Sequence, residues 1–336
     1  MVVKKILVIV VIIVYLIILR ICVKRNKTLH EIMKPDLYNK TILDGDKKFK
    51  PKKNQTEYDN YVKKGFETMK TKSIVFCGLF QNSAYIFDKF KKKMETLQPY
   101  FKDMKIVVFE NDSSDNSRVL LLNWEKENKN VDIYKVENNE YNLLKNDSAK
   151  NHGVFSGGRM KKMATYRNLL KTYVEQKYSN YDYYAVIDTD IRGPISLNGI
   201  AYSFGIEQDI KWDMISAFGV TAGILSLNNY AYYDQLALYH MKTYLDIFKA
   251  LKYYPIKNRK IGDKPKKVKS AFCGLAIYKM ASVKNVDYTP KDGNYICEHI
   301  IFHNNMIDKG HENIFINPNM LILAGKQGKA KDYFAY

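Results

Sequence analysis

The sequence lacks the patterns that identify disulfide-linked, zinc-binding or phosphate-loop proteins. Its 336 residues include only four cysteines and no Cys-x-x-Cys pair, so neither a disulfide framework nor a zinc knuckle is indicated. The sequence also contains no His-Glu-x-x-His motif, no glycine-rich phosphate loop and no internal repeat. What remains is a chain with an ordinary apolar core, which its 46% hydrophobic and 13% aromatic content supports.

Acidic residues are in the minority, with 35 Asp and Glu against 54 Lys and Arg, so the net charge is +19. Such a charge favours anionic partners such as nucleotides, acidic glycans or membrane head groups. A solvated lysine-rich surface explains the same charge equally well. No RNA-binding aromatic signature or DNA-reading element accompanies it, and we therefore expect no nucleic-acid partner.

The N-terminus carries an apolar run that predicts a membrane anchor. Residues 6–19 contain no charge, and the flanking apolar residues extend the run to residue 23. This length approaches the roughly 20 residues that a bilayer requires, and no small-x-small cleavage site follows. We therefore predict a cytoplasmic tail and transmembrane signal anchor over residues 1–23, contacting the membrane through residues 6–23.

Three Asn-x-Thr sequons follow the apolar run, at Asn26, Asn39 and Asn54. They favour a single-pass type II protein with its body in the lumen of the Golgi or ER. Cations flank the run on both sides, so a body that faces the cytosol remains an alternative. Residues 24–71 are lysine-rich with little periodicity, which is typical of a stem that is partly ordered at best.

From residue 72 to residue 336 short apolar strands alternate with helices. This pattern predicts an α/β fold, a Rossmann-like mixed, mostly parallel sheet flanked by helices, with ligands at the carboxyl ends of the strands. We expect a nucleotide-binding half over about 72–190 and an acceptor half over 191–336. The expected strands are 73–79, 105–110, 131–136, 183–188, 213–218, 271–278 and 313–317, and the expected helices are 82–97, about 115–128, 156–178 and 297–309.

The most informative segment is Tyr-Tyr-Ala-Val-Ile-Asp-Thr-Asp at residues 183–190. It predicts a buried strand that leads directly into an Asp-x-Asp pair, Asp188 and Asp190. Two carboxylates one residue apart make a hard-oxygen site for Mg²⁺ or Mn²⁺. A divalent ion held there can neutralise a departing diphosphate.

A second polar segment, Glu-Asn-Asp-Ser-Ser-Asp at residues 110–115, follows the strand 105–110. Glu110 or Asp112 could accept hydrogen bonds from a ribose or nucleobase, whereas the serines and Asp115 could simply cap the next helix.

The third feature is Arg167, which falls on the apolar stripe of the helix 156–178 and therefore needs an anionic partner. One alternative is a structural carboxylate. The other is a functional anion, either the nucleotide phosphate or an aspartate of the metal site, and Arg159 could reach the same anion.

The segment Cys-Glu-His-Ile-Ile-Phe-His at residues 297–303 opens a helix near the C-terminus. His299 and His303 lie on or beside its buried stripe, where a histidine is more often a core residue than a metal ligand. Glu298, at the helix start, is a candidate general base for an incoming hydroxyl.

Taken together, these motifs resemble those of the GT-A glycosyltransferases. The resembling segments are residues 107–115, Arg159 with residues 164–168, residues 187–190, and residues 297–303. The order and spacing of the first three are similar to the fungal capsule-associated (alpha-1,3-) mannosyltransferases, which are type II membrane proteins, and the resemblance covers about residues 73–323. One departure leaves the donor sugar and the stereochemistry open. Those enzymes tend to have Asn-Asp-Val where this chain has Asp-Thr-Asp.

The resemblance implies a nucleotide-sugar donor and a role for each site residue. Asp112, with Glu110 beside it, would contact the nucleoside, and Asp188 would bind the ribose or a metal-bound water. Asp190 would ligate Mn²⁺ or Mg²⁺ across the diphosphate, with Arg159 or Arg167 assisting electrostatically.

On the acceptor side, His303 or His299 would complete the metal shell, as a histidine often does in GT-A enzymes. Glu298 would deprotonate the acceptor if the reaction inverts, and Gly274 would permit close approach of the donor sugar.

The resulting prediction is a membrane-anchored hexosyltransferase, with mannose one candidate sugar. It would act on a GDP- or UDP-sugar and on a glycan, glycoprotein or glycolipid acceptor. Two alternatives remain: an inactive membrane-anchored glycan-binding module that uses its 27 tyrosines to stack on sugars, and a metal-dependent phosphohydrolase or nucleotidyltransferase.

Overall fold

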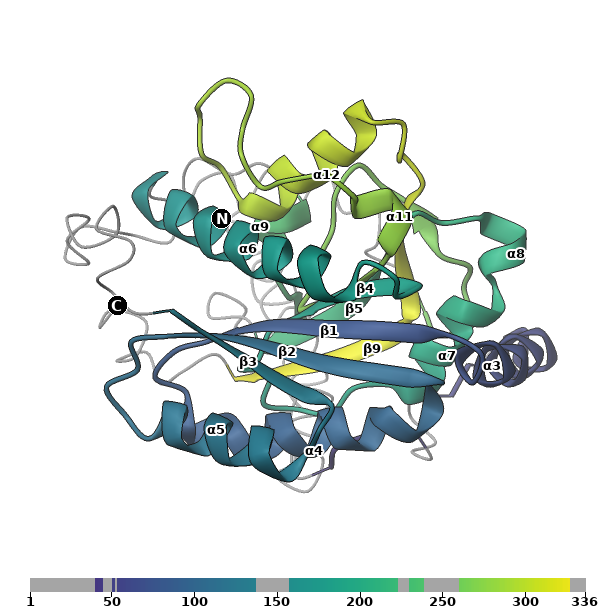
Figure 1. Ribbon diagram of the computed structural model, residues 1–336. Helices are drawn as coiled ribbons and strands as arrows, with labels where there is room; N and C mark the ends of the chain where they lie inside the picture. The colour runs from purple at the N-terminus through teal and green to yellow at the C-terminus, as the bar shows by residue number, and fades with distance from the viewer. Residues whose placement is uncertain are drawn as a thin grey trace, which may run out of the picture.

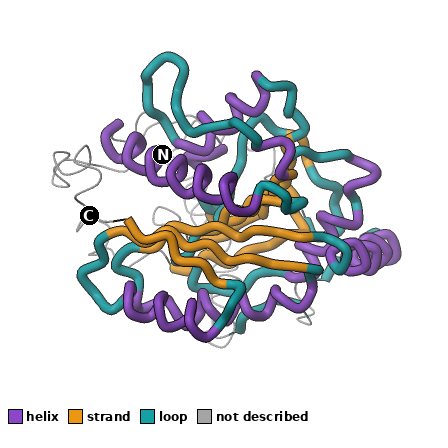
Figure 2. Tube along the Cα trace, in the orientation of Figure 1, coloured by secondary structure: helices purple, strands orange, loops and turns teal. Residues whose placement is uncertain are grey.

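The computed structural model describes residues 40–44, 50–51, 53–136, 157–222, 230–238 and 260–326. Within these residues a nine-stranded mixed sheet has the order β3-β2-β1-β4-β8-β5-β9-β7, and β6 pairs with β5. The sheet crosses the molecule with helices on both of its faces (Figures 1 and 2). The mixed α/β fold with a mostly parallel sheet is therefore confirmed.

The first half of the sheet is entirely parallel. Its strands are β3 (Val131–Val136), β2 (Asp103–Asn111), β1 (Ser73–Phe80) and β4 (Tyr183–Ile187). Strand β1 pairs with β2 and with β4, and β2 pairs with β3, all in parallel register. Because parallel strands end at the same edge, the segments that follow β1, β2 and β4 are brought together there.

The second half of the sheet mixes directions. Its strands are β8 (Leu275–Lys279), β5 (Met214–Ala222), β9 (Ile314–Lys326), β7 (Lys266–Lys267) and β6 (Tyr230–Tyr232). Strand β8 runs antiparallel between β4 and β5, and β9 is parallel to β5. Strand β8 begins four residues later than expected, because Cys273 and Gly274 have φ angles of +61° and +83°, outside the range of a strand.

Two layers of helices cover the sheet (Figure 1). On one face lie η2 (Ala84–Ile86), α4 (Phe87–Leu97), η3 (Gln98–Tyr100) and α5 (Ser117–Glu127). On the other lie α6 (Gly157–Tyr178), α9 (Gln235–Leu238), α11 (Met280–Val283) and α12 (Glu298–Asp308). Alternating residues of β1 explain this arrangement, because Phe76 packs into the cluster of α4 and α5 while Cys77 packs into that of α6.

Two further helices cross with their backbones very close together: α3 (Gln55–Met69) and α7 (Leu197–Gly205). The short helix α8 (Glu207–Ile210) follows α7. A Cβ on Gly65 would lie 1.7 Å from the Ala201 carbonyl oxygen, and one on Gly205 would lie 1.9 Å from the Tyr61 carbonyl oxygen. Only glycine permits this approach. Residues 55–69, expected within a partly ordered stem, therefore form a helix packed onto the body.

The expected membrane span lies outside the described residues, which begin at residue 40. Among the helices that the structure does describe, none has the length and apolar character needed to cross a membrane. The anchor over residues 6–23 and its orientation therefore stay predictions.

Candidate functional site

The candidate site forms where β4 ends and the chain turns into Asp188. The backbone N–H of Asp188 donates to the carbonyl oxygen of Gly274 at 2.9 Å, which joins the two predicted site residues. A Cβ on Gly274 would lie 3.0 Å from Cε1 of Tyr233 and 3.1 Å from Cδ1 of Ile191. Gly274 thus permits close packing of protein groups beside Asp188, in addition to any approach by a ligand.

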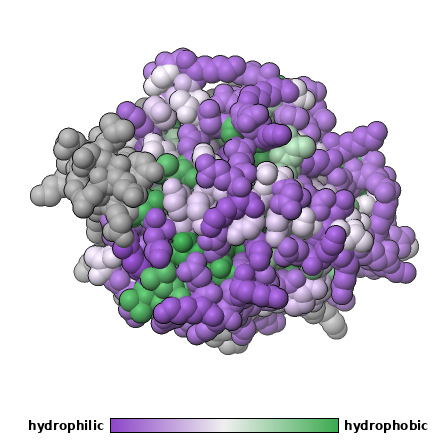
Figure 3. Space-filling view, viewed as in Figure 1, coloured by the Kyte–Doolittle hydropathy of each residue, from purple (hydrophilic) through white to green (hydrophobic). Residues whose placement is uncertain are grey.

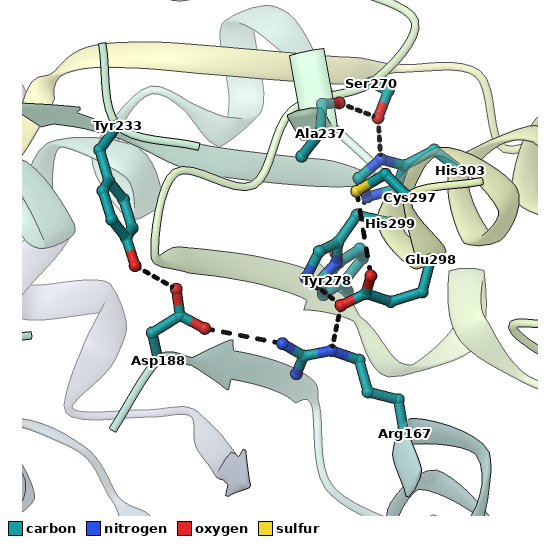
Figure 4. Close-up of polar contacts among 10 residues, drawn as sticks. All are labelled: Arg167, Asp188, Tyr233, Ala237, Ser270, Tyr278, Cys297, Glu298, His299 and His303. Atoms are coloured by element: carbon teal, nitrogen blue, oxygen red, sulfur yellow. Dashed lines mark hydrogen bonds and ion pairs between the residues drawn. The ribbon is translucent and has the colours of Figure 1, made fainter. Parts of the chain in front are cut away.

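Arg167 connects two acidic residues that are far apart in the sequence (Figure 4). Its Nε donates to Oε1 of Glu298 at 3.1 Å, and its Nη2 lies 3.6 Å from Oδ1 of Asp188. The guanidinium also lies 5.3 Å from the centre of the Phe272 ring. Only 4% of the Arg167 side chain is exposed, so its charge is balanced inside the protein. Its partners in the structure are therefore a buried carboxylate and the first aspartate of the Asp-x-Asp pair, and a contact with a nucleotide phosphate stays a prediction.

Two further residues of the site carry no recognisable sequence motif. The Tyr233 hydroxyl donates to Oδ2 of Asp188 at 2.9 Å, opposite the Arg167 contact (Figure 4). The next residue, Asp234, has a φ of +59°, and its Oδ2 is buried without a hydrogen-bond partner in the structure. Sequence reasoning missed both because they lie about 45 residues beyond Asp188, in a segment without periodicity.

The carboxylates of this site are held in a setting that disfavours their charge. Burial raises the pKa of Asp188 to about 7, and the nearby Asp190 adds to the rise against the opposing Arg167. Burial likewise raises the pKa of Asp234 to about 7, with the charges of Asp188 and Glu298 contributing. The carboxylates of Asp188, Asp234 and Glu298 thus outnumber the single guanidinium of Arg167, so binding of a proton or a cation here is favourable.

Asp190 is more exposed than Asp188. Its side chain is exposed, while 23% of the Asp188 side chain is exposed. Partial removal from water raises the pKa of Asp190, and the positive charges of Arg192 and Lys93 oppose that rise. Lys93 of α4 is itself buried, donates to the carbonyl oxygen of Ile191, and has its pKa lowered to about 7 by burial.

The donor set fits a hard divalent cation in its chemistry. Asp188 and Asp190 supply carboxylate oxygens that remain partly accessible, and Asp234 adds a buried oxygen with no hydrogen bond. Over the described ranges, however, no group of three or more His, Cys, Asp or Glu side chains is placed to hold a metal ion. The residues therefore suit such an ion, while a complete coordination shell is not formed in this structure.

Neither histidine lies with the aspartates in a metal-binding group. The ring of His303 is held at Nδ1 by the Ser270 hydroxyl at 2.8 Å and at Nε2 by the Tyr278 hydroxyl at 3.0 Å, and burial lowers its pKa to about 3. The ring of His299 stacks on Phe272 with 3.7 Å between centres, and neither of its nitrogens has a hydrogen-bond partner. Both therefore occupy the core position that is usual for a histidine on an apolar face.

Glu298 was expected as a general base, but the structure gives it a different setting. Its side chain is 8% exposed, and one of its oxygens accepts the hydrogen bond from Arg167. Its other oxygen lies 4.0 Å from Sγ of Cys297. In this conformation Glu298 holds Arg167 in place and does not face the solvent.

The loop after β2 divides into structural and accessible residues. Glu110 is fully buried, accepts from the Ser113 N–H at 2.9 Å and pairs with Arg118, so it braces the loop. Asp115 accepts from the N–H groups of Ser117 and Ala84 at 2.9 and 3.0 Å, which ties the start of α5 to the segment after β1, while the N-cap itself is Asn116. Asp112 is partly exposed and has a φ of +45°, and its expected contact with the nucleoside stays a prediction.

Arg159 is not brought beside Arg167. It is exposed in the first turn of α6, whereas Arg167 lies two turns further along and is buried. Eight residues of helix separate the two Cα atoms by about 12 Å, so Arg159 could reach the same anion only if that anion extends along the helix.

No protein-family model and no curated protein matches this sequence. Among solved structures, S. aureus TarS 1–349 is similar at 10% identity and a TM-score of 0.44, over 75% of this chain and 60% of that chain. The same protein in complex with UDP-GlcNAc gives 11% identity and a TM-score of 0.45, over 79% and 61% of the two chains. The mannosyltransferase PcManGT from Pyrobaculum calidifontis, in complex with GDP-Man and Mn²⁺, gives 11% identity and a TM-score of 0.42, over 84% and 68%.

This chain therefore spans about 60% of the length of the TarS structures that it matches. Likenesses this distant do not identify a function, so we infer the function from the residues of the site.

Proposed function

We propose that this chain is a glycosyltransferase of the GT-A type, which transfers a hexose from a GDP- or UDP-linked donor to a glycan or glycoconjugate. The observation that carries the proposal is the position of Asp188-Thr189-Asp190. This acidic pair leaves the carboxyl end of a central parallel strand, where α/β proteins bind their ligands, and a buried arginine contacts its first carboxylate.

The surrounding residues fix the orientation of Asp188. Oδ1 lies beside the Arg167 guanidinium and Oδ2 accepts the Tyr233 hydroxyl, so both carboxylate oxygens have a defined direction. Glu298 holds Arg167 from the far side. Such outer contacts preorganise a ligand-binding carboxylate, because its geometry is set before the ligand arrives.

Asp188 and Asp190 are the residues that would hold Mn²⁺ or Mg²⁺, with Asp234 as a further oxygen donor close by. When bound, the divalent ion supplies charge neutralisation for the departing diphosphate. The proposed contribution of Asp112 is to bind the nucleoside at the same sheet edge, since it follows β2, two strands from β4.

The finer parts of the proposal rest on the sequence. They are the single-pass anchor at residues 6–23, the type II orientation with a lumenal body, and the choice of a glycan, glycoprotein or glycolipid as acceptor. Mannose is one candidate donor sugar.

The test uses the full-length chain in detergent, assayed for turnover of common GDP- and UDP-sugars with and without Mn²⁺. We expect metal-dependent turnover of one donor and its loss in Asp190→Ala, because the exposed Asp190 contributes no core packing. The matched control is Asp59→Ala, an exposed aspartate on α3. Silence of the folded wild-type chain with every donor, or full activity of Asp190→Ala, contradicts the proposal.

A further inference from the structure

The outer side of α6 carries a hollow that is separate from the candidate site. Its volume is about 350 Å³, which is at the lower end of the roughly 300–1,000 Å³ of small-ligand pockets. It lies between α6, strand β3 and the segment that leads into α12. The lining residues are Tyr134, Thr165, Asn168, Leu169, Thr172, Tyr173, Gln176, Thr289 and Tyr295.

None of these lining side chains carries a charge. By contrast, 26% of the whole sequence is Asp, Glu, Lys or Arg, and most of the face in Figure 3 is hydrophilic. Two lysines lie beside lining rings: Nζ of Lys161 is 6.0 Å from the centre of the Tyr295 ring, and Nζ of Lys177 is 4.3 Å from that of Tyr173. Lys177 also donates to Asp132, so its charge is paired. Because the lining side chains are uncharged and the nearby Lys177 is paired with Asp132, the hollow offers little to a phosphate, a nucleotide or an acidic peptide.

The lining combines aromatic rings with hydroxyl and amide groups. The Tyr134 and Tyr173 rings stack on each other at 4.4 Å between centres, and Lys177 lies over the Tyr173 ring, so these two rings form a wall of the hollow. Tyr295, which is partly exposed, is the ring that a ligand could pack against. Thr172 and Gln176 are exposed and present uncharged polar groups to the solvent. A neutral sugar has the matching chemistry, since its C–H faces pack on aromatic rings and its hydroxyls both donate and accept hydrogen bonds.

The hollow is rigidly connected to the candidate site. Asn168 follows Arg167 on α6, and its Oδ1 accepts from the Tyr288 N–H at 2.7 Å while its Nδ2 donates to the Thr289 hydroxyl at 3.2 Å. The helix therefore carries Arg167 on its buried side and the floor of the hollow on its outer side. A chain bound in the hollow is held at a fixed distance from Asp188.

We propose that this hollow is a subsite for one or two neutral sugar units of an extended glycan. The identification of that glycan as the acceptor rests on the proposed transferase function, but the binding itself does not. The subsite takes no part in bond making, and its effect is to raise the local concentration of a long acceptor.

Binding is tested first, on the full-length chain in detergent and without any donor. The probes are three neutral oligosaccharides, mannotetraose, maltotetraose and N-acetylchitotetraose, observed by saturation-transfer NMR and titration calorimetry. We expect at least one to bind, and we expect Thr172→Lys and Tyr295→Ala to weaken that binding fivefold or more. Thr71→Lys, at an exposed threonine just after α3 and outside the Asn-x-Thr sequons, is the matched control and retains wild-type binding.

Two outcomes overturn the subsite. One is no binding of any of the three probes by the folded wild-type chain. The other is binding that both hollow variants retain, which would place the sugar elsewhere.

Failure of the transferase proposal gives a different pattern. In that case no donor turns over, yet binding and its loss in Thr172→Lys and Tyr295→Ala persist. If both proposals hold, the two variants raise the KM for a long acceptor fivefold or more and leave the kcat and the donor KM unchanged.

Discussion

The buried contact between Arg167 and Glu298 makes the sharpest prediction for the stability of this site. The two side chains are 4% and 8% exposed, with 3.1 Å between Nε and Oε1. Removing one member of such a pair leaves an uncompensated buried charge, which costs about 3–5 kcal/mol. We therefore expect Arg167→Met to lower the free energy of unfolding by about that amount at pH 7.

The paired variant separates the charge from the packing. Glu298→Gln is expected to cost less than Arg167→Met, because Asp188 still lies 3.6 Å from Nη2 of the arginine. In the double variant the stranded Glu298 charge is gone, so its cost falls below the sum of the two single costs. The expected coupling energy is about 0.5–3 kcal/mol, as found for residues in direct contact.

The assay is urea unfolding of the full-length chain, followed by tryptophan fluorescence. Trp124 and Trp212, the only tryptophans of the sequence, are both almost fully buried and lie on different elements of the body. Both therefore report loss of the core. A cost below about 1 kcal/mol for Arg167→Met, or additive costs in the double variant, would refute the reasoning.

Two further predictions concern the acidic cluster and the helix crossing. The pKa of Asp234, like that of Asp188, is raised in the metal-free folded chain, which therefore binds the carboxyl proton more tightly than the unfolded chain does. Proton binding thus stabilises the fold; the stabilisation is complete below about pH 4 and is lost as the pH rises through 7. Asp234→Asn should therefore raise the urea midpoint at pH 8 and leave it unchanged near pH 4; an equal shift at both pH values would contradict the linkage. Gly65→Ala should destabilise the chain by about 1–3 kcal/mol, because its Cβ would meet the Ala201 backbone at 1.7 Å. Gly157→Ala, whose Cβ would meet nothing within 4 Å, is the matched control, and equal thermal midpoints for the two variants would count against the packing argument.

The strand and helix pattern was readable from the sequence because it depends on local periodicity. The run at residues 183–190 gave a buried strand and a polar exit, and β4 with its Asp188 turn matches that expectation. The apolar stripe of α6 likewise placed Arg167 on the buried side, where it is 4% exposed. Features of this kind need only a few neighbouring residues to be recognised.

The sequence did not predict which residues far apart in the chain contact one another. The hydrogen bond from Tyr233 to Asp188 joins residues 45 apart, and no spacing rule connects them. Lys93 stands in a run of lysines that looks solvated, yet its side chain is buried and reaches the carbonyl oxygen of Ile191. Glu298 looked like an exposed helix-start acid, but the position of α12 against α6 turns it towards Arg167. Each of these depends on tertiary packing, which overrides the local pattern.

The place of β9 in the sheet sets the order in which a nascent chain can fold. Strand β9 lies between β5 and β7, and its Leu321 and Leu323 pack with Leu43, near the first described residues. At about 5–20 residues per second, a ribosome needs on the order of ten seconds to pass from β5 to β9. Until β9 is made, the edge of β5 that faces β9 has no partner. Glu298 is made only shortly before β9 begins, so Arg167 lacks its buried partner for most of that interval. The buried charge pair and the sheet are therefore both completed late in synthesis, and the unfinished chain exposes a strand edge until then.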